Sequence, residues 1–216
     1  MKNLIILAFA AIVFSSCSKE RISASGDKIT ETRSPGTFTG VNSAGGNDVH
    51  ISYGTEYKVT LRGSDNLIPH FKTEIMSNIL YLKYDGVNVN RDDIDIHITL
   101  PLINYISLNG SGEIDIKGQF PEADKFKVNI SGSGEVDLEN TLTANETTVS
   151  ISGSGEADLE RLETKIADID ISGSGDAKIN VTESLKARIS GSGKIYYFGS
   201  PAIDSKISGS GKVIKL

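Results

Sequence analysis

The chain has 216 residues, with 22 Lys and Arg against 28 Asp and Glu and a formal net charge of −6. This acidic balance argues against a nucleic-acid binder, because such a protein needs a basic surface to displace counterions from phosphates. The single cysteine excludes a disulfide framework and a cysteine-rich zinc site, and the three histidines are scattered. The length fits one domain or two small ones.

Residues 1–16 have the layout of a secretory signal peptide, with Lys2 before an apolar run and small residues at the end. Cys17 follows directly, as in a bacterial lipoprotein signal, where this cysteine becomes the lipidated first residue of the mature chain. A plain signal peptide with an idle thiol is the alternative. Residues 17–33 are polar and are predicted to be a flexible tether. We therefore expect a lipid anchor in the outer membrane of the cell envelope, facing either the periplasm or the surface.

The strongest pattern is the tetrapeptide Ser/Asn-Gly-Ser-Gly, which occurs six times between residues 109 and 211 at steps of 22, 21, 20, 18 and 18. Apolar residues at every second position on both sides predict one strand before and one strand after each copy. A sharp bend between stacked strands needs positive φ or close backbone approach, so the glycines are predicted to be structural turn residues. They are Gly110, Gly112, Gly132, Gly134, Gly153, Gly155, Gly173, Gly175, Gly191, Gly193, Gly209 and Gly211.

A coil of about 20 residues cannot bury its own apolar side, so neighbouring coils must stack. The predicted fold class is therefore all-β, a parallel β-helix or β-solenoid with coils of 18–22 residues. It is expected to span residues 34–216 in about eight coils, irregular over 34–100 and regular over 101–216. A separate β subdomain at 34–100 is the alternative.

Four segments of the irregular part support this interpretation. Residues 41–51 align without gaps with residues 106–116, and Asn47 takes the place of the second glycine as a residue that tolerates positive φ. Residues 59–65 look like a further copy. Alternating runs at 79–84 and 94–100 supply strands for about two more coils.

These features resemble the DUF2807 family of Bacteroidota, described as "putative autotransporter adhesin, head GIN domain". The resemblance rests on the lipoprotein start, the segment Gly63–Leu67, the Leu100-Pro101 entry and the Gly-Ser-Gly corners, and it covers roughly residues 36–212. It implies a right-handed single-stranded β-helix and a role in cell adhesion. It brings no catalytic residues and no cofactor.

Acidic residues recur one and three positions after the corners, and stacking would align them in two columns about 5 Å apart. They are Glu113, Asp115, Glu135, Asp137, Glu156, Asp158 and Asp176. One hypothesis is a divalent cation site, since Ca²⁺ takes several carboxylate oxygens. The alternative, which we favour, is a solvated outer face, because the chain lacks the nonapeptide repeat of calcium-binding solenoids.

We expect no catalysis. The connections between coils, about ten residues each, are too short to wall a cleft, and the corner serines have no histidine partner within their motif. The densest acid and histidine group, at residues 92–97, is interpreted as an exposed strand face. The expected function is a non-catalytic envelope lipoprotein that binds a glycan or an envelope or host protein, through an extended surface. The alternatives are a polysaccharide-active enzyme and a periplasmic structural or regulatory lipoprotein.

Overall fold

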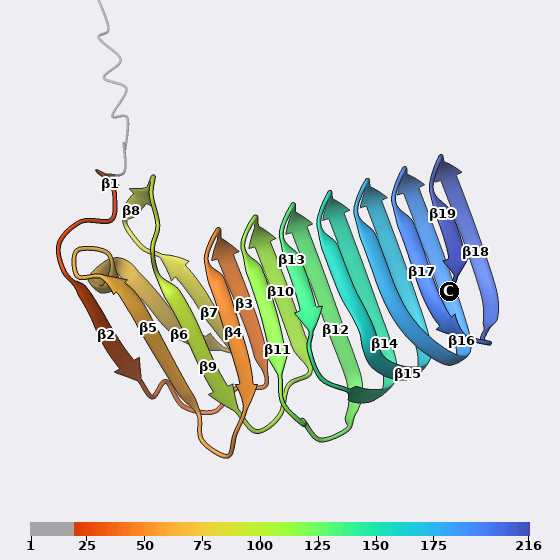
Figure 1. The fold of residues 1–216 in the computed structure, drawn as a ribbon, viewed down its shortest axis with the longest axis horizontal. Coiled ribbons are helices and arrows are strands. Elements are labelled where there is room, and N and C mark those ends of the chain that lie inside the picture. The colour runs from red at the N-terminus through yellow and green to blue at the C-terminus, as the bar shows by residue number, and fades with distance from the viewer. Residues whose placement is uncertain (1–19) are drawn as a thin grey trace, which may run out of the picture.

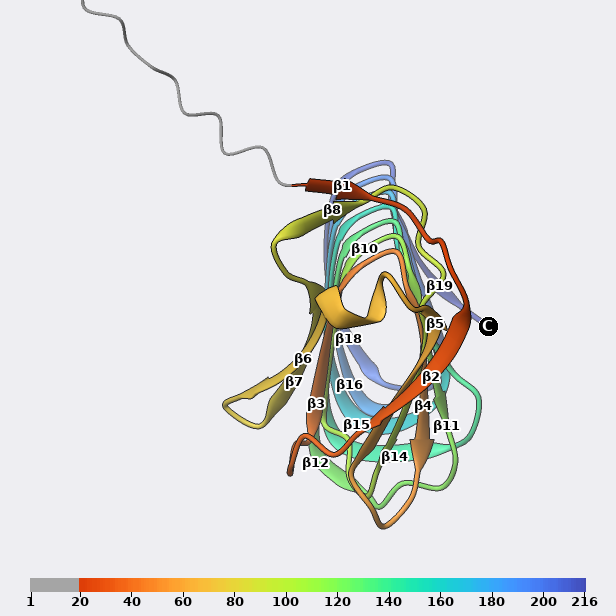
Figure 2. The same cartoon turned by 90° about the vertical axis from the view of Figure 1, so that its left-hand side faces the viewer.

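The computed structural model describes residues 20–216, where nineteen strands and one short 3₁₀ helix are found (Figure 1). The predicted all-β solenoid is confirmed. Its strands form two facing walls, joined by Gly-Ser-Gly corners along one edge and by short returns along the other (Figure 2). The residues predicted to form a signal peptide, and Cys17 with its predicted lipidation, lie outside the described residues. Within residues 20–216, no helix is long and apolar enough to cross a membrane.

The first wall consists of strands that run toward the corners, together with the antiparallel β6. In stacking order they are β6 (Phe71–Met76), β7 (Ile79–Tyr84), β3 (Gly40–Gly45), β10 (Tyr105–Gly110), β12 (Ala123–Gly132), β14 (Leu142–Gly153), the second halves of β15 (Glu156–Gly173) and β16 (Asp176–Gly191), and β18 (Ala202–Gly209).

The second wall consists of the strands that leave the corners, together with β5 and β2. In stacking order they are β2 (Lys28–Arg33), β5 (Lys58–Ser64), β9 (Asp95–Leu100), β4 (Asp48–Tyr53), β11 (Glu113–Lys117), β13 (Glu135–Leu138), the first halves of β15 and β16, β17 (Lys194–Gly199) and β19 (Lys212–Lys215). β1 (Glu20–Ile22) pairs with β8 (Val87–Val89) beside the two walls.

Stacking follows the sequence repeat in register from residue 105 onward. Each first glycine pairs with the first glycine of the next copy, as Gly110 does with Gly132. The interior positions are filled by Ile, Val, Leu and Ala, and one core extends from Phe38 to Tyr197. Residues 34–100 therefore share a sheet and a core with the regular windings.

The two glycines of a corner have different roles. At the first one, Gly153, φ is +121°, and a Cβ would overlap the carbonyl oxygen of Gly132 in the preceding winding. That oxygen accepts a hydrogen bond from the backbone N–H of Ser154 at 2.8 Å. Gly155, the second, has no positive φ, but a Cβ there would overlap the side chain of Ile130. The first glycine of a corner is therefore needed both for its positive φ and for the close approach of the preceding winding. The second glycine is needed only for the close approach.

This difference explains why Asn47 can occupy the position of a second corner glycine. Its φ is not positive, so the expectation that Asn was chosen for left-handed backbone is wrong. The position tolerates a side chain because the winding before it, β7 to β9, has no Gly-Ser-Gly corner. Residues 85–94 leave the wall there and carry β8. The Asn47 amide fills the space and donates hydrogen bonds to Asp92 and to the Ile94 carbonyl.

The N-terminal part departs from the sequence prediction in two further ways. Residues 20–22 and 28–33, expected within a flexible tether, form β1 and β2, and β2 is held by Arg33, which donates to the carbonyls of Phe71 and Ile68. Residues 59–65 are not a further coil, because β5 runs antiparallel to both β2 and β9. The 3₁₀ helix η1 (Ile68–His70) lies across the opening between the walls at this end (Figure 2).

The windings also do not stack in chain order. The predicted strands at 79–84 and 94–100 are present as β7 and β9, and they form one winding, not two. That winding lies on the far side of β3 and β4, which pair on their other side with β10 and β11. The gapless alignment of 41–51 with 106–116 therefore corresponds to direct stacking.

Candidate functional site

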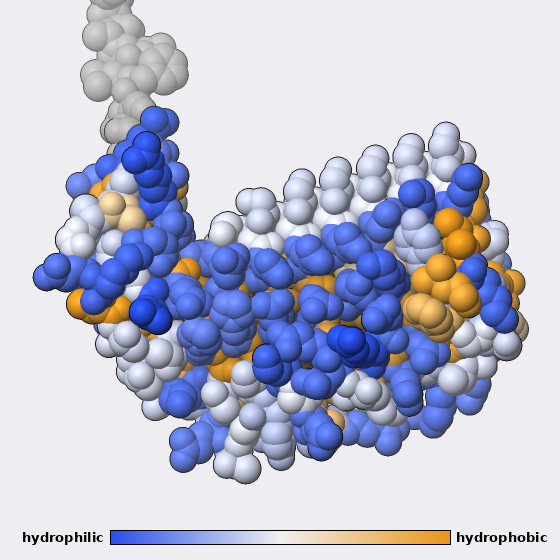
Figure 3. Space-filling view, viewed as in Figure 1, coloured by the Kyte–Doolittle hydropathy of each residue, from blue (hydrophilic) through white to orange (hydrophobic). Residues whose placement is uncertain are grey.

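The outward side chains of the second wall form two columns of charged residues. All seven acids singled out in the sequence lie in them, in register. The first column contains Asp48, Glu113, Glu135, Glu156, Asp176, Lys194 and Lys212. The second contains His97, His50, Asp115, Asp137, Asp158 and Lys178. We call the outward face of β4, β11, β13 and the start of β15 the acidic wall; it faces the viewer in Figure 3.

Sequence reasoning missed the N-terminal end of these columns. Asp48 pairs with Glu113, and His50 pairs with Asp115. The gapless alignment of residues 41–51 with 106–116 already contained this information, since it places each pair at the same repeat position. What it could not show is His97, which joins the second column from a winding that lies out of chain order.

Like charges in the acidic wall repel one another. Neighbouring Asp115 raises the pKa of Glu113, with burial and Glu135 adding to the effect. Burial raises the pKa of Glu135, and so does Glu156. Burial likewise raises the pKa of Asp137, with contributions from the acids above and below it. Carboxylates directly opposite each other on adjacent strands destabilise a sheet, so this face carries negative charge that the chain does not balance.

Further along the solenoid, lysine side chains balance the negative charge of the columns. The ammonium group of Lys178 lies 2.6 Å from Asp158 and 3.1 Å from Glu156, and these two acids raise its pKa. Beside the columns, Lys117 pairs with Glu139 at 3.0 Å. The unbalanced stretch therefore lies between β4 and β13.

Two histidines lie at the N-terminal end of the acidic wall. Nδ1 of His50 is 2.8 Å from Asp115, its Nε2 is 3.2 Å from Asp95, and its ring stacks on His97 at 5.0 Å between centroids. They line a hollow of about 250 Å³ with Asp115, Lys117 and Glu139. Both His50 nitrogens already contact carboxylates. Within residues 20–216, no three His, Cys, Asp or Glu side chains are arranged to hold a metal ion, and calcium binding by the seven predicted acids stays a sequence-based prediction.

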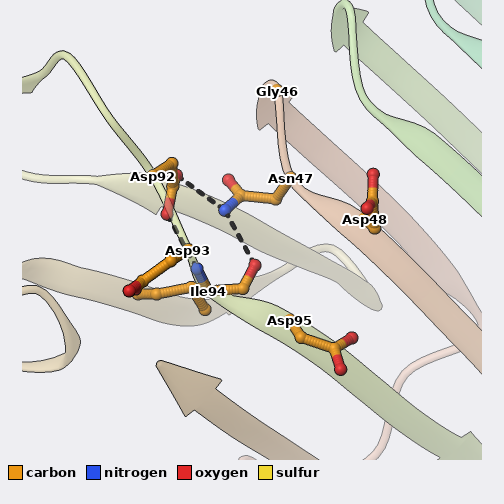
Figure 4. Close-up of a pocket in the computed structure, with 7 residues that line it drawn as sticks. All are labelled: Gly46, Asn47, Asp48, Asp92, Asp93, Ile94 and Asp95. Atoms are coloured by element: carbon orange, nitrogen blue, oxygen red, sulfur yellow. Dashed lines mark hydrogen bonds between the residues drawn. The ribbon is translucent and has the colours of Figure 1, made fainter. Parts of the chain in front are cut away.

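The acid group at residues 92–95 has a different role. Figure 4 shows it around a hollow of about 170 Å³ beside Asn47 and Asp48. Asp92 accepts hydrogen bonds from Asn47 at 2.7 Å and from the Tyr84 hydroxyl at 2.6 Å. Asp93 accepts from Ser64 and pairs with Lys28. These carboxylates hold the enlarged corner of residues 85–94 against its neighbours.

The first wall is polar but mostly uncharged near its centre. Its outward residues on β10, β12 and β14 include Ser107, Asn129, Ser150 and Thr148. A shallow hollow of about 360 Å³ lies there, lined by Asn129, Ser131, Ser150, Ser152, Asp170, Ser172 and Arg188, with two buried isoleucines beneath. The corner serines form an exposed ridge along the edge (Figure 3).

Crystal structures of other proteins have the same fold. A "putative adhesin" from Bacteroides fragilis is 25% identical with a TM-score of 0.72, and the match covers 90% of this chain and 100% of that one. A "putative adhesin" from Parabacteroides merdae is 20% identical with a TM-score of 0.64, over 91% and 99% of the two chains. A "putative lipid binding protein" from Parabacteroides distasonis is 19% identical with a TM-score of 0.61, over 91% and 100%. The last two likenesses show the fold alone.

A family model described as "Putative auto-transporter adhesin, head GIN domain" matches residues 37–143 and 141–201. A search of curated proteins found no match. The family match spans both the N-terminal windings and the regular corners, which is most of the chain. The chain therefore belongs to the DUF2807 family.

Proposed function

We propose that this protein is a non-catalytic adhesin of the cell envelope that binds a basic segment of a partner protein on its acidic wall. The observation that carries the proposal is the excess of in-register carboxylates between β4 and β13, where the pKa values of Glu113, Glu135 and Asp137 are raised. A cationic partner relieves repulsion that the folded chain leaves in place. Charge complementarity of this kind also speeds association.

The shape of the solenoid supports binding over catalysis. The return between β11 and β12 spans only residues 118–122, and that between β13 and β14 only residues 139–141. These returns are shorter than the ten residues expected from sequence, and β15 and β16 pass through the return as continuous strands. General acid–base chemistry on a polysaccharide needs a substrate held against the acids, whereas the acidic wall is an open surface whose hollow of about 250 Å³ lies at its N-terminal end.

Binding to a basic peptide tests the proposal. The probe is a labelled oligolysine peptide, with an oligoglutamate peptide of the same length as the negative control. A variant that combines Glu113→Gln, Glu135→Gln and Asp137→Asn is expected to bind at least about tenfold more weakly. Binding by the unchanged chain should weaken with added salt.

A charge-matched variant controls for net charge. Glu122→Gln, Asp124→Asn and Glu183→Gln remove three carboxylates from exposed positions outside the acidic wall. This variant should bind like the unchanged chain. Equal losses in the two triple variants would contradict a site on the acidic wall, and release of reducing ends from polysaccharide would contradict the absence of catalysis.

A second candidate is glycan binding on the first wall. It is favoured by the shallow hollow around Asn129 and Ser150, whose hydroxyl and amide groups suit sugar hydroxyls. A glycan array separates the two candidates. If Asn129→Ala loses binding to a glycan of the array and the acidic-wall variant retains it, glycan binding is assigned to the first wall.

The proposal places the protein at the membrane through lipid on Cys17. Incorporation of labelled fatty acid should be lost in Cys17→Ala. Protease treatment of whole cells then distinguishes an adhesin on the surface from a periplasmic lipoprotein, since only a surface protein is degraded without breaking the cells.

A further inference from the structure

The C-terminal end of the solenoid is open. β18 pairs with β16 on one side, and within residues 20–216 no strand pairs with its other side. All its residues are exposed, including Ile203 at 45% and Ile207 at 42%. These two side chains continue the interior ladders of Leu185 and Ile189. Unpaired backbone groups and apolar side chains are thus exposed together on β18.

The sequence of β18 is complementary to itself when two copies run antiparallel. With a two-fold axis at Ser205, Ile203 of one copy faces Ile207 of the other. Asp204 then faces Lys206, and each of these contacts occurs twice. Residues directly opposite across an antiparallel pair have Cβ atoms about 5 Å apart, which suits both apolar packing and an ion pair.

The two charged residues of β18 lack partners within the described chain. Among the ion pairs of residues 20–216, neither Asp204 nor Lys206 takes part. Lys206 lies beside Arg188, a second cation, which already pairs with two acids of the first wall. An acid from a second copy would give Lys206 the counter-charge that its own winding does not provide.

We propose that β18 is a dimer interface, on which a second copy of this chain adds its own β18 antiparallel about Ser205. At the N-terminal end, β6 is the outermost strand of the first wall, and η1 lies across the opening between the walls (Figure 2). A head-to-tail contact between β18 and β6 would give open oligomers, whereas the two-fold pairing of β18 closes as a dimer.

The neighbouring edge strand, β19, does not extend the contact. Lys215 fills the interior position that Tyr197 holds one winding earlier. An inward charge on an edge strand discourages pairing with another chain. The interface is therefore confined to β18 and the first wall.

Cysteine cross-linking tests the register in the full chain carrying Cys17→Ala. Ser205→Cys lies at the axis and is expected to form a disulfide-linked dimer under mild oxidation. Ser208→Cys is the matched control, since Ser208 faces Ala202 of the other copy and lies far from its own equivalent. A mixture of Ala202→Cys and Ser208→Cys chains should link, although neither variant links alone.

A charge swap tests the ion pair by light scattering over a range of protein concentrations. Asp204→Lys or Lys206→Asp alone places like charges opposite each other and should weaken the dimer about tenfold or more. The double swap should restore it. A monomer at every concentration, equal linking by Ser205→Cys and Ser208→Cys, or open oligomers larger than a dimer would each overturn the proposal.

Discussion

The windings after residue 105 and the part before residue 101 share one core, but their strands are paired and connected in different ways. In the regular windings, chain order equals stacking order, every pairing is parallel, and glycine corners allow close approach. In the N-terminal part, β2, β5 and β6 pair antiparallel. Residues 85–94 connect β7 to β9 in place of a glycine corner, and side-chain hydrogen bonds such as that from Asn47 to Asp92 hold them. Antiparallel strands and η1 lie at that end of the stack, whereas the parallel repeat continues to the outermost strands at the other end of residues 20–216. Regular repetition lengthens a solenoid, and the irregular strands depart from that repeat.

Glycine substitutions should produce the largest difference between the two regions. Gly153→Ala adds both left-handed strain and overlap with the carbonyl of the preceding winding, so we expect a loss of about 3–4 kcal/mol of unfolding free energy. Gly86 has φ +76° but nothing within 4 Å of a Cβ, so Gly86→Ala should cost only about 1 kcal/mol. Urea unfolding followed by circular dichroism measures both. Similar losses would mean that stacking distance does not constrain the corners.

Asn47 tests how the irregular winding is held. Asn47→Ala leaves Asp92 and the Ile94 carbonyl without a donor, which should cost about 2 kcal/mol. Asn47→Gly restores a regular corner in sequence, yet it should cost about the same, because the loss comes from the hydrogen bonds. Asn88→Ala, at an exposed position of β8, is the control, with a loss below about 0.5 kcal/mol. A stabilised Asn47→Gly would show that the glycine corner is preferred even here.

The sequence was informative where the corner tetrapeptide recurs. Alternating apolar residues and paired glycines were sufficient to predict the windings from 105 to 216 and the register of the acidic columns, since stacking at one repeat fixes every other position. It could not predict that β7 and β9 lie beyond β3 and β4, because that order depends on long-range pairing. β2 was missed because its polar, exposed residues do not distinguish an edge strand from a tether.

The charged columns should give a smaller effect that depends on pH. The pKa of Glu135 is higher in the fold than in the unfolded chain, so its charged form destabilises the fold above the folded pKa, and this effect disappears below the unfolded pKa. Glu135→Gln should therefore raise the melting temperature by about 1–3 °C at pH 7. The gain should vanish as the pH falls toward about 4.

Asp158→Asn is the matched comparison on the same wall. Asp158 contacts Lys178 at 2.6 Å, so its neutralisation should lower the melting temperature at pH 7 instead of raising it. If both variants shifted the melting temperature in the same direction, local pairing would not decide the sign.

Calcium should give the smallest effect. The carboxylates stand in columns along an open wall, and within residues 20–216 no three of them surround one point as calcium ligands must. Millimolar calcium should therefore raise the melting temperature only as much as magnesium at the same concentration, through screening of the repulsion between neighbouring strands. A larger shift with calcium, abolished by Glu135→Gln with Asp137→Asn but kept in Glu122→Gln with Asp124→Asn, would instead establish the columns as a calcium site. It would also change the comparison between regions, because the regular windings would then be stabilised by a bound ion as well as by their glycine corners.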